Sequence, residues 1–449
     1  MKHRQQSGHL PKLLPRPMPA LALCALLVGL LLSACTPQPA TLSFVVSQRE
    51  ADYWQPLIEE FEDKHPHIRI ALLNADNSIL DKPDGTDELK RFLVAAFEKN
   101  SPYDLISLDI IWVPEFAESG WLMDLTDEFD KEQLEEEFLV SEVENGFYRH
   151  RLYRLPFRTD VGVLYYRQDL LQEAGLEPPD TFEELIQISQ TLQKQIRWGY
   201  LWQGQTEALI AMFVEILKGY GGFWINSQTG AVGLDRPEAI QAVEFLRQTI
   251  EAGISPQGIT TYEEEETRRL FRDGHAAFMR NWPNVWVDAN RPGTSVYGKI
   301  AIQPMVHASG EESSVCKGGW GLGIAKATKH PQAALQAIKF FTSAAAQQQF
   351  TLAYGSVPSR RQLFFEPKIV AKYSHYPQLL NMIDRYWVAR PRIPQYAQAS
   401  CLLQKHLRQA LNPDEQGDPS PQQAMQDAAR ETRHLLTQGT SDCELTTME

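Results

Sequence analysis

The sequence contains few cysteines, and their spacing does not indicate a metal site. Its 449 residues include five cysteines, with no CxxC pair and no cluster of cysteine with histidine. Structural zinc sites usually need such groups of ligands, so we expect neither a metal nor another cofactor. Beyond the N-terminal segment, Cys316, Cys401 and Cys443 remain. Three cysteines allow at most one intramolecular disulfide, and the sequence leaves open whether one forms.

The sequence also lacks an excess of positive charge. It has 43 Lys and Arg against 57 Asp and Glu, for a formal net charge of -14. Such a chain is not expected to bind nucleic acid. The glycine-rich stretch KGGWGLGIA at residues 317–325 lacks the GxxxxGK[ST] spacing of a phosphate-binding loop. There is no internal repeat and no low-complexity segment.

The apolar run near the N-terminus is shorter than a typical membrane-spanning helix. Residues 20–32 are apolar and follow a basic segment without acids, which is typical of a signal peptide. The run ends in LSAC, which resembles the lipobox of bacterial lipoproteins. This resemblance implies removal of residues 1–34, lipidation of Cys35, and a tether over residues 35–41 at the outer face of the cytoplasmic membrane. The alternative is an ordinary signal peptide followed by a chance cysteine.

The next residues have the pattern of a β-α-β unit. We predict strands at residues 41–47 and 67–73, with a helix at residues 52–64 between them. In a doubly wound α/β sheet, ligands bind beyond the carboxyl ends of parallel strands. Glu50 is predicted in the first such loop, and Asp109 at the end of a buried strand. Both are candidate ligand-binding residues, although Glu50 alternatively only stabilises the helix dipole.

The stretch LPFRTDVGVLYYR at residues 155–167 is the most informative one. It indicates a proline-marked loop that leads into a buried strand. Arg158 and Asp160 precede that strand, and their i, i+2 spacing places them on the same side of an extended chain. Charges next to a buried strand need a partner. The pair is therefore either a structural ion pair or part of a ligand site.

Two tryptophans are candidate platforms for a ligand. Trp282 precedes a proline at the end of a strand-like segment, and Trp320 is flanked by glycines that permit close approach of the backbone. Tryptophan more often serves packing alone. The acidic stretch at residues 124–144 is interpreted as a solvated surface.

Several motifs together resemble the family 1 extracellular solute-binding proteins of ABC importers, most closely the trehalose/maltose-binding proteins. They are DYW at residues 52–54, ESGWL at 118–122, LPFRTDVGVLYYR at 155–167, RNWP at 280–283, GGW at 318–320 and ARPRIPQY at 389–396. The resemblance implies an α/β, two-lobe periplasmic-binding-protein fold of type II, like that of maltose-binding protein. It has a cleft between the lobes and three hinge crossings, near residues 156–160, 306–317 and 356–361.

The resemblance also implies lobe boundaries. The N-terminal lobe would comprise residues 42–157 and 308–358, and the C-terminal lobe residues 158–307 and 359–440. Residues 441–449 would form a tail.

The site residues follow from the same resemblance. They are the acids Glu50, Asp109 and Asp160, the aromatic platforms Trp282 and Trp320, the hydroxyl-binding Arg390, and Gly319 through its backbone. Arg158 replaces an aromatic residue that similar proteins tend to have, and it pairs either with Asp160 or with the ligand. The loop at residues 74–86 does not align with the family's ligand loop and contributes no residue.

The function implied is capture of a small α-glucoside by closure of the lobes, without catalysis. The ligand would be a disaccharide or a compatible solute of the glucosylglycerol type. The partners would be permease subunits and an ATPase, and the protein would be a monomer. The alternatives are a non-sugar ligand such as a peptide or an anion, and, more remotely, a glycoside hydrolase that uses Glu50, Asp109 and Asp160.

Overall fold

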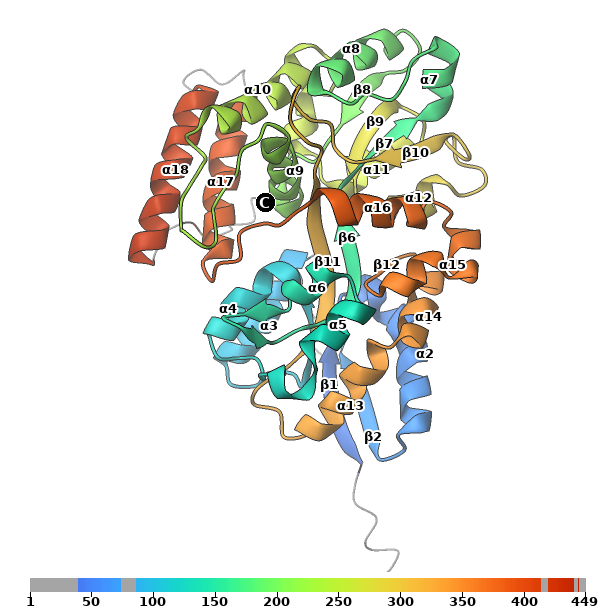
Figure 1. Cartoon of the computed structure of the whole chain (residues 1–449), viewed down its shortest axis with the longest axis vertical. Helices are drawn as coiled ribbons and strands as arrows, with labels where there is room; N and C mark the ends of the chain where they lie inside the picture. Colours follow the sequence, from blue (N-terminus) through green and yellow to red (C-terminus); the bar gives the residue numbers. More distant parts are fainter. Residues whose placement is uncertain (1–38, 74–85, 413–418, 440–442, 444–449) are drawn as a thin grey trace, which may run out of the picture.

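The computed structural model describes residues 39–73, 86–412, 419–439 and 443. The predicted signal peptide, Cys35 and nearly all of the loop at residues 74–86 lie outside this range. The described chain has two α/β parts, one above the other in Figure 1. Strands β6 and β11 run between them.

The lower part is built on a seven-stranded sheet with the order β12-β6-β11-β3-β1-β2, to which β13 adds by pairing with β11. The strands are β1 Ala40–Val45, β2 Ile68–Leu73, β3 Leu105–Asp109, β6 Leu155–Val161, β11 Val315–Ile324, β12 Val357–Pro358 and β13 Trp387–Val388. A small hairpin pairs β4 Phe147–Tyr148 with β5 Arg151–Leu152. The helices of this part are α2 Gln48–Lys64, α3 Thr86–Glu98, α4 Val113–Glu118, α5 Lys131–Glu137, α6 Val140–Glu144, α13 Pro331–Phe341 and α14 Ala344–Tyr354.

The upper part is built on a four-stranded sheet with the order β10-β7-β9-β8. Its strands are β7 Val163–Arg167, β8 Trp198–Leu201, β9 Ala276–Asn281 and β10 Ile300–Gln303. The remaining helices are α7 Gln168–Ala174, α8 Phe182–Leu192, α9 Thr206–Gly219, α10 Pro237–Glu251, α11 Glu264–Arg272, α12 Val285–Ala289, α15 Pro367–Lys372, α16 Tyr376–Tyr386, α17 Tyr396–Leu411 and α18 Pro421–Gln438. Short 3-10 helices are η1 Ile110–Trp112, η2 Thr126–Glu128, η3 Gln257–Thr261 and η4 Arg361–Phe365.

The predicted β-α-β opening is confirmed. Strands β1 and β2 pair in parallel from Ala40 with Ile68 to Val45 with Leu73, and α2 connects them. Strand β3 pairs in parallel with β1 on its other side. The carboxyl ends of the three strands therefore lie at one edge of the sheet, where Asp109 ends β3. Strand β1 begins at Ala40, so it includes the last two residues of the predicted tether.

The prediction of a loop before the buried strand at residues 155–167 was wrong. Residues 155–161 form β6, which is paired along one edge with β11 and at its centre with β12. Pro156 is tolerated there because it lies where the register of β6 and β11 shifts, between Trp320 and Gly321, so that no regular ladder bond from its nitrogen is needed. Only Gly162 separates β6 from β7, which belongs to the upper sheet.

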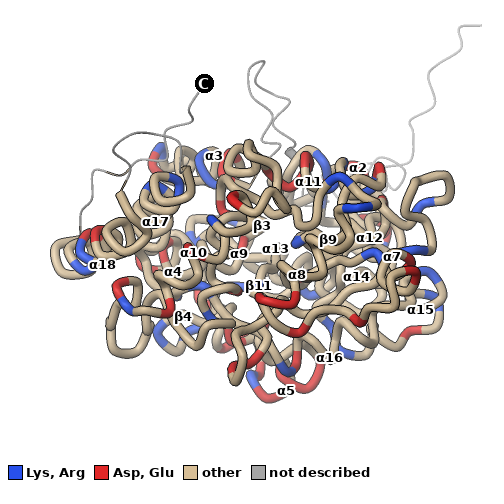
Figure 2. The backbone as a smooth tube through the Cα atoms, turned by 90° about the horizontal axis from the view of Figure 1, so that it is seen from above, with Lys and Arg blue, Asp and Glu red and all other residues tan. Residues whose placement is uncertain are grey.

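The acidic stretch at residues 124–144 is only partly a solvated surface. The acids of α5 lie at the surface (Figure 2), as predicted. Glu142 in α6, however, is completely buried. The sequence pattern could not show this, because the cations that compensate its charge come from other segments.

No helix in the described part of the chain is both long enough and apolar enough to cross a membrane. A disulfide joins Cys401 in α17 to Cys443, which follows α18, and Cys316 is a buried free thiol. The disulfide closes a segment of 42 residues and fastens the chain beyond α18 to α17.

We expect loss of this disulfide to lower the free energy of unfolding. Closing 42 residues of the unfolded chain corresponds to about 3–4 kcal/mol in the chain-entropy model. Denaturant titration of Cys443→Ser against the oxidised wild type measures the difference. A reductant should then weaken the wild type to the level of the variant and leave the variant unchanged; equal stability of both under oxidising conditions would contradict the prediction.

Candidate ligand-binding site

A row of three side chains crosses the large sheet at the edge where the carboxyl ends of its parallel strands lie. In the ladder, Trp320 of β11 lies opposite Arg158 of β6 on one side and opposite Asp109 of β3 on the other. Directly opposed residues place their side chains on the same face of a sheet. All three predicted acids and both predicted arginines meet on the two sides of Trp320.

The first group consists of Glu50, Arg158 and Asp160, which we call the first triad. Arg158 Nη2 donates to Glu50 Oε1 at 2.6 Å, and its Nη1 lies 3.5 Å from Asp160 Oδ2. The i, i+2 contact of Arg158 with Asp160 is thus confirmed. Its shorter contact is with Glu50, which lies 108 positions away in the chain.

Glu50 does not lie in a loop, as predicted, but in the first turn of α2. The helix begins one turn earlier than the apolar pattern indicated, and Ser47 in extended conformation occupies its N-cap position. The neighbouring turn is fixed by Trp54, whose ring is 4.5 Å from that of Phe157. Trp54 Nε1 also donates to Glu50 Oε2 at 3.5 Å. Packing of α2 therefore sets the position of the Glu50 carboxylate.

The second group consists of Asp109, Arg390 and Glu207, which we call the second triad. Arg390 Nη1 lies 3.0 Å from Glu207 Oε2, and its Nη2 lies 3.9 Å from Asp109 Oδ1. Glu207 also accepts hydrogen bonds from Tyr396 Oη at 2.6 Å and from the Ser400 hydroxyl. These contacts hold Arg390 in one orientation next to Asp109.

Glu207 follows a strained residue at the start of α9. Thr206, the first residue of the helix, has a φ of 59°. A β-branched residue rarely adopts such an angle, and the surrounding structure has to enforce it. Strained backbone of this kind concentrates at functional sites.

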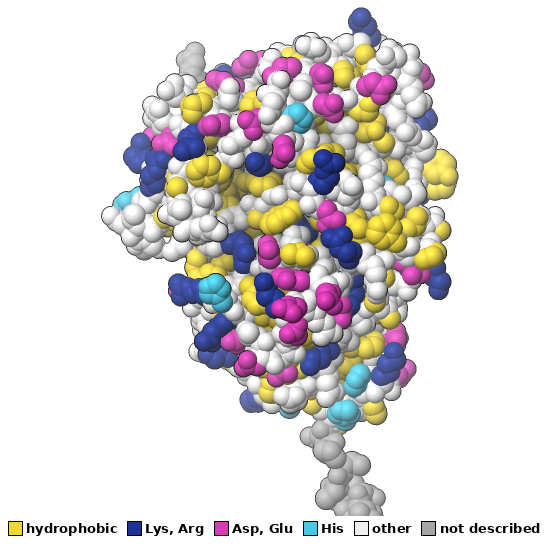
Figure 3. Space-filling view, viewed as in Figure 1, with side chains coloured by type: hydrophobic (Ala, Val, Ile, Leu, Met, Phe, Trp, Pro, Cys, Tyr) yellow, Lys and Arg dark blue, Asp and Glu magenta, His cyan; other side chains and the backbone are white. Residues whose placement is uncertain are grey.

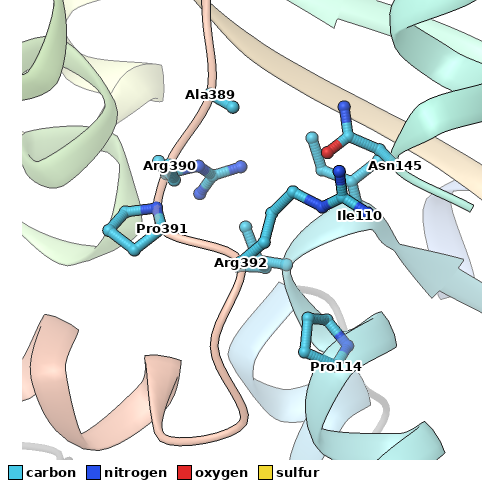
Figure 4. Close-up of a pocket in the computed structure, with 8 residues that line it drawn as sticks. Ile110, Pro114, Asn145, Ala389, Arg390, Pro391 and Arg392 are labelled. Carbon is cyan, nitrogen blue, oxygen red and sulfur yellow. The ribbon is translucent and has the colours of Figure 1, made fainter. Parts of the chain in front are cut away.

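Arg390 belongs to the segment that links β13 to α17 and passes between the two parts of the molecule. Figure 4 shows Arg390 and Arg392 of this segment beside Ile110 and Asn145 of the lower part. Arg392 donates to the backbone oxygen of Phe147 in the lower part, and its own backbone nitrogen donates to Ser227 Oγ at 3.1 Å. The segment thus contacts both parts.

Trp282 approaches the row from the upper part. Asp160 lies opposite Gly318 in the ladder, and a Cβ on Gly318 would lie 3.3 Å from the Trp282 ring. The absent side chain of Gly318 therefore leaves room for Trp282 next to Asp160. Arg280 lies against the ring of Trp282 at 4.3 Å, and the indole nitrogen donates to Glu264.

Gly319 points to the other face of the strand, where a buried group of charges lies. Its φ is 150°, and a Cβ there would lie 2.5 Å from Glu142 Oε1. Glu142 pairs with Lys317 at 3.1 Å and with Arg154 at 3.0 Å, and all three side chains are fully buried. Glycine at position 319 is thus required by Glu142; its predicted backbone role towards a ligand stays a prediction.

Burial raises the pKa values of Asp109 and Asp160. The pKa of Asp160 rises from 3.8 to about 7, chiefly through desolvation, which the Arg158 charge opposes. Desolvation likewise raises the pKa of Asp109, against the charge of Arg390. Desolvation by burial, with the charge of Glu207 adding to it, raises the pKa of Asp87 in α3 to about 6. Loss of solvation is thus the main cause in all three cases.

The structure brings together the predicted residues around Trp320, with Gly319 on the reverse face. Sequence reasoning missed Glu207, Glu264 and Glu142. A glutamate in the first turn of a helix is common for electrostatic reasons alone, so the position of Glu207 gave no functional signal. Figure 3 shows a recess with hydrophobic side chains between the upper and lower parts.

Comparison with known proteins defines the class of the fold. The solved structure of maltose-bound T. maritima MalE3 aligns with 88% of this chain and 100% of its own, with a TM-score of 0.78 and 31% sequence identity. The chain has the two-lobe fold of the periplasmic binding proteins, as predicted.

Residues 47–348 match the bacterial extracellular solute-binding protein family, and the chain belongs to this family. A probable ABC transporter-binding protein of Deinococcus radiodurans is 29% identical over 301 residues, 65% of this chain and 70% of that protein. The maltotriose-binding protein of Pyrococcus abyssi is 26% identical over 326 residues, 71% of this chain and 66% of that protein. The chain thus spans about two thirds of the length of these curated relatives.

We expect Gly319→Ala to destabilise the protein more than a substitution at a glycine with strained backbone alone. The added Cβ would displace Glu142 from its buried cations, which should cost at least about 2 kcal/mol beyond backbone strain. Gly310→Ala is the matched control, because Gly310 has a φ of 89° but no atom within 4 Å of its added Cβ. Denaturant titration measures both, and equal losses would show that the contact with Glu142 is unimportant.

We also expect Asp160 to make stability depend on pH. Its pKa of about 7 in the folded protein lies above the unfolded value of 3.8. The folded state therefore binds the proton more tightly, and the free energy of unfolding should fall as the pH rises from about 4 to about 7. In Asp160→Asn this contribution disappears, so the stability difference between variant and wild type should change over that range. A constant difference would argue against a raised pKa.

Proposed function

We propose that the protein is the substrate-binding lipoprotein of an ABC importer that captures a small α-glucoside, either a disaccharide or a compatible solute of the glucosylglycerol type. It delivers this ligand to membrane permease subunits that work with an ATPase. The observation that carries the proposal is the pair of acid–arginine–acid triads on either side of Trp320. The same proposal includes lipidation of Cys35, a monomeric state and the lobe boundaries predicted from the sequence.

The chemistry of the row suits a hydroxylated ligand. Carboxylates accept hydrogen bonds from hydroxyl groups, guanidinium groups donate to them, and an indole face covers the apolar side of a pyranose ring. The buried Nε atoms of Arg158 and Arg390 have no hydrogen-bond partner within the described residues. Leaving such donors unpaired is costly, and a ligand that draws the two guanidinium groups towards it would give them an acceptor.

The balance of charge favours a neutral ligand over an anion. Each arginine of the site already contacts two carboxylates, those of Glu50 and Asp160 or those of Asp109 and Glu207. An anionic ligand would have to compete with these acids for the same donors. The charge balance alone does not decide against a peptide, so peptides belong in the ligand screen.

Closure of the lobes is the proposed mechanism of capture. Asp109 comes from the lower part, whereas Glu207 and Trp282 come from the upper part. A ligand that contacts residues of both parts binds the closed arrangement better and shifts the population towards it. No bond is made or broken in this process.

A glycoside hydrolase is the less favoured alternative. Hydrolysis requires two carboxyl groups on opposite sides of the scissile bond, one with a raised pKa and one ionised. The raised pKa of Asp160 meets one requirement. Arg158, however, contacts both Asp160 and Glu50 and occupies the space between them. In addition, the family and the similar proteins are described as binding proteins.

A ligand screen tests the proposal. The chain from Thr36 onward should be examined by thermal shift and calorimetry with monosaccharides, disaccharides, glucosylglycerol, amino acids, short peptides and inorganic phosphate. A ligand that binds only the folded state raises the melting temperature. We expect a selective shift with an α-glucoside that is lost in Asp160→Asn and Trp282→Ala.

Trp198→Ala is the matched control for the screen, because this tryptophan lies in β8, an edge strand of the upper sheet. It should keep the shift of the wild type. Binding of a peptide or phosphate together with the absence of any sugar effect would refute the sugar assignment. Release of glucose from an α-glucoside by the purified protein would favour the hydrolase.

A further inference from the structure

Arg158 lies on the ring of Trp320. Its guanidinium carbon is 5.2 Å from the centre of the indole, and the two residues are directly opposed in the ladder of β6 and β11. The contacts with Glu50 and Asp160 hold the guanidinium in this place. A planar cation at this distance interacts favourably with the indole face. A ligand can therefore displace it only by making contacts that are more favourable.

Trp320 is enclosed from another direction as well. The ring of Trp112 lies 5.2 Å from that of Trp320, at an angle of 86°. The indole of Trp320 is therefore in contact with a guanidinium group and with a second indole. A pyranose ring that stacks on Trp320 would first have to displace Arg158 from two carboxylates.

The environment of Trp282 is different. Arg280 lies against its ring at 4.3 Å, is completely buried, and is fixed to Glu215 by hydrogen bonds of 2.6 and 2.9 Å. This cation supports the indole from inside the protein. In the described part of the chain, no aromatic ring pairs with Trp282, and its side chain is only partly buried. Trp282 can therefore offer a face to a sugar ring.

We propose that Arg158 determines specificity by closing the Trp320 platform, so that the site accepts a single pyranose ring on Trp282. The ligand class is a glycoside with one ring and a short, flexible, hydroxylated aglycone, which extends towards the second triad. The inference rests on the proposed function and narrows it, because a rigid second ring would need the face that Arg158 covers. Arg158 thus acts as a specificity-determining residue at a position where an aromatic residue would extend the binding platform.

The test compares ligands with one and two rings by calorimetry. Methyl α-glucoside and glucosylglycerol represent one ring, and maltose and trehalose represent two. We expect the wild type to prefer the better one-ring ligand over both disaccharides by at least about tenfold, since one aromatic contact corresponds to about that factor. In Arg158→Ala the ratio should move towards the disaccharides by about tenfold or more.

The two tryptophans provide a second measurement that does not depend on the folding of Arg158→Ala. With the one-ring ligand, Trp282→Ala should lose at least about tenfold in affinity, whereas Trp320→Ala should stay within about threefold of the wild type. Thermal melting of each variant confirms that it is folded. Equal losses in both variants would overturn the inference.

The outcomes for the two proposals are distinguishable. If the wild type binds a disaccharide more tightly than either one-ring ligand, the role of Arg158 is refuted while the sugar receptor stands. If the wild type binds none of the four sugars, the proposed function itself fails.

Discussion

Alternation of side chains along β6 and β11 is the constraint on which the rest of the site depends. Arg158 and Trp320 point to the face that the candidate ligand site occupies, whereas Lys317 and the Cβ position of Gly319 point to Glu142 on the other face. Two sets of charges therefore lie back to back across the same two strands. A shift of one residue in register would exchange them and bury the site residues. The register of this ladder is thus as important to the site as any of its residues.

The buried set of charges explains why that register is fixed. Lys317 pairs with Glu142 from the lower part, and the backbone nitrogen of the preceding Cys316 donates at 3.0 Å to Glu215 of α9 in the upper part. Glu215 in turn pairs with Arg280, whose side chain supports Trp282. Removing one partner from such a pair leaves an uncompensated buried charge and typically costs about 3–5 kcal/mol. Two buried carboxylates from different parts of the molecule therefore hold β11 and, through it, the position of Trp320.

The features of the fold that depend on residues close together in the sequence could be predicted from it. Apolar periodicity placed α2 between two parallel strands, and the spacing of Arg158 and Asp160 indicated their contact. The burial of Glu142 could not be predicted, because an acidic stretch gives no sign of cations that arrive from positions 154 and 317. The same reason applies to Glu207, whose partner Arg390 lies 183 positions further along the chain. Pairings at such separations depend on the tertiary fold, which only the family resemblance indicated.

On the proposed function, the positions of the two triads link ligand recognition to closure of the lobes. The first triad lies on β6 and α2 next to the point where the chain crosses between the lobes, and the second joins Asp109 of one part to Glu207 of the other through Arg390. A ligand held at Trp282 in one lobe that reaches Asp109 in the other therefore contacts both lobes at once. One that reaches only a single lobe gains nothing from closure and cannot shift the equilibrium between open and closed forms. On the proposed function, the length and flexibility of the aglycone decide whether the lobes close. The residues that select the ligand are then the same residues that produce the closed form, which the importer recognises.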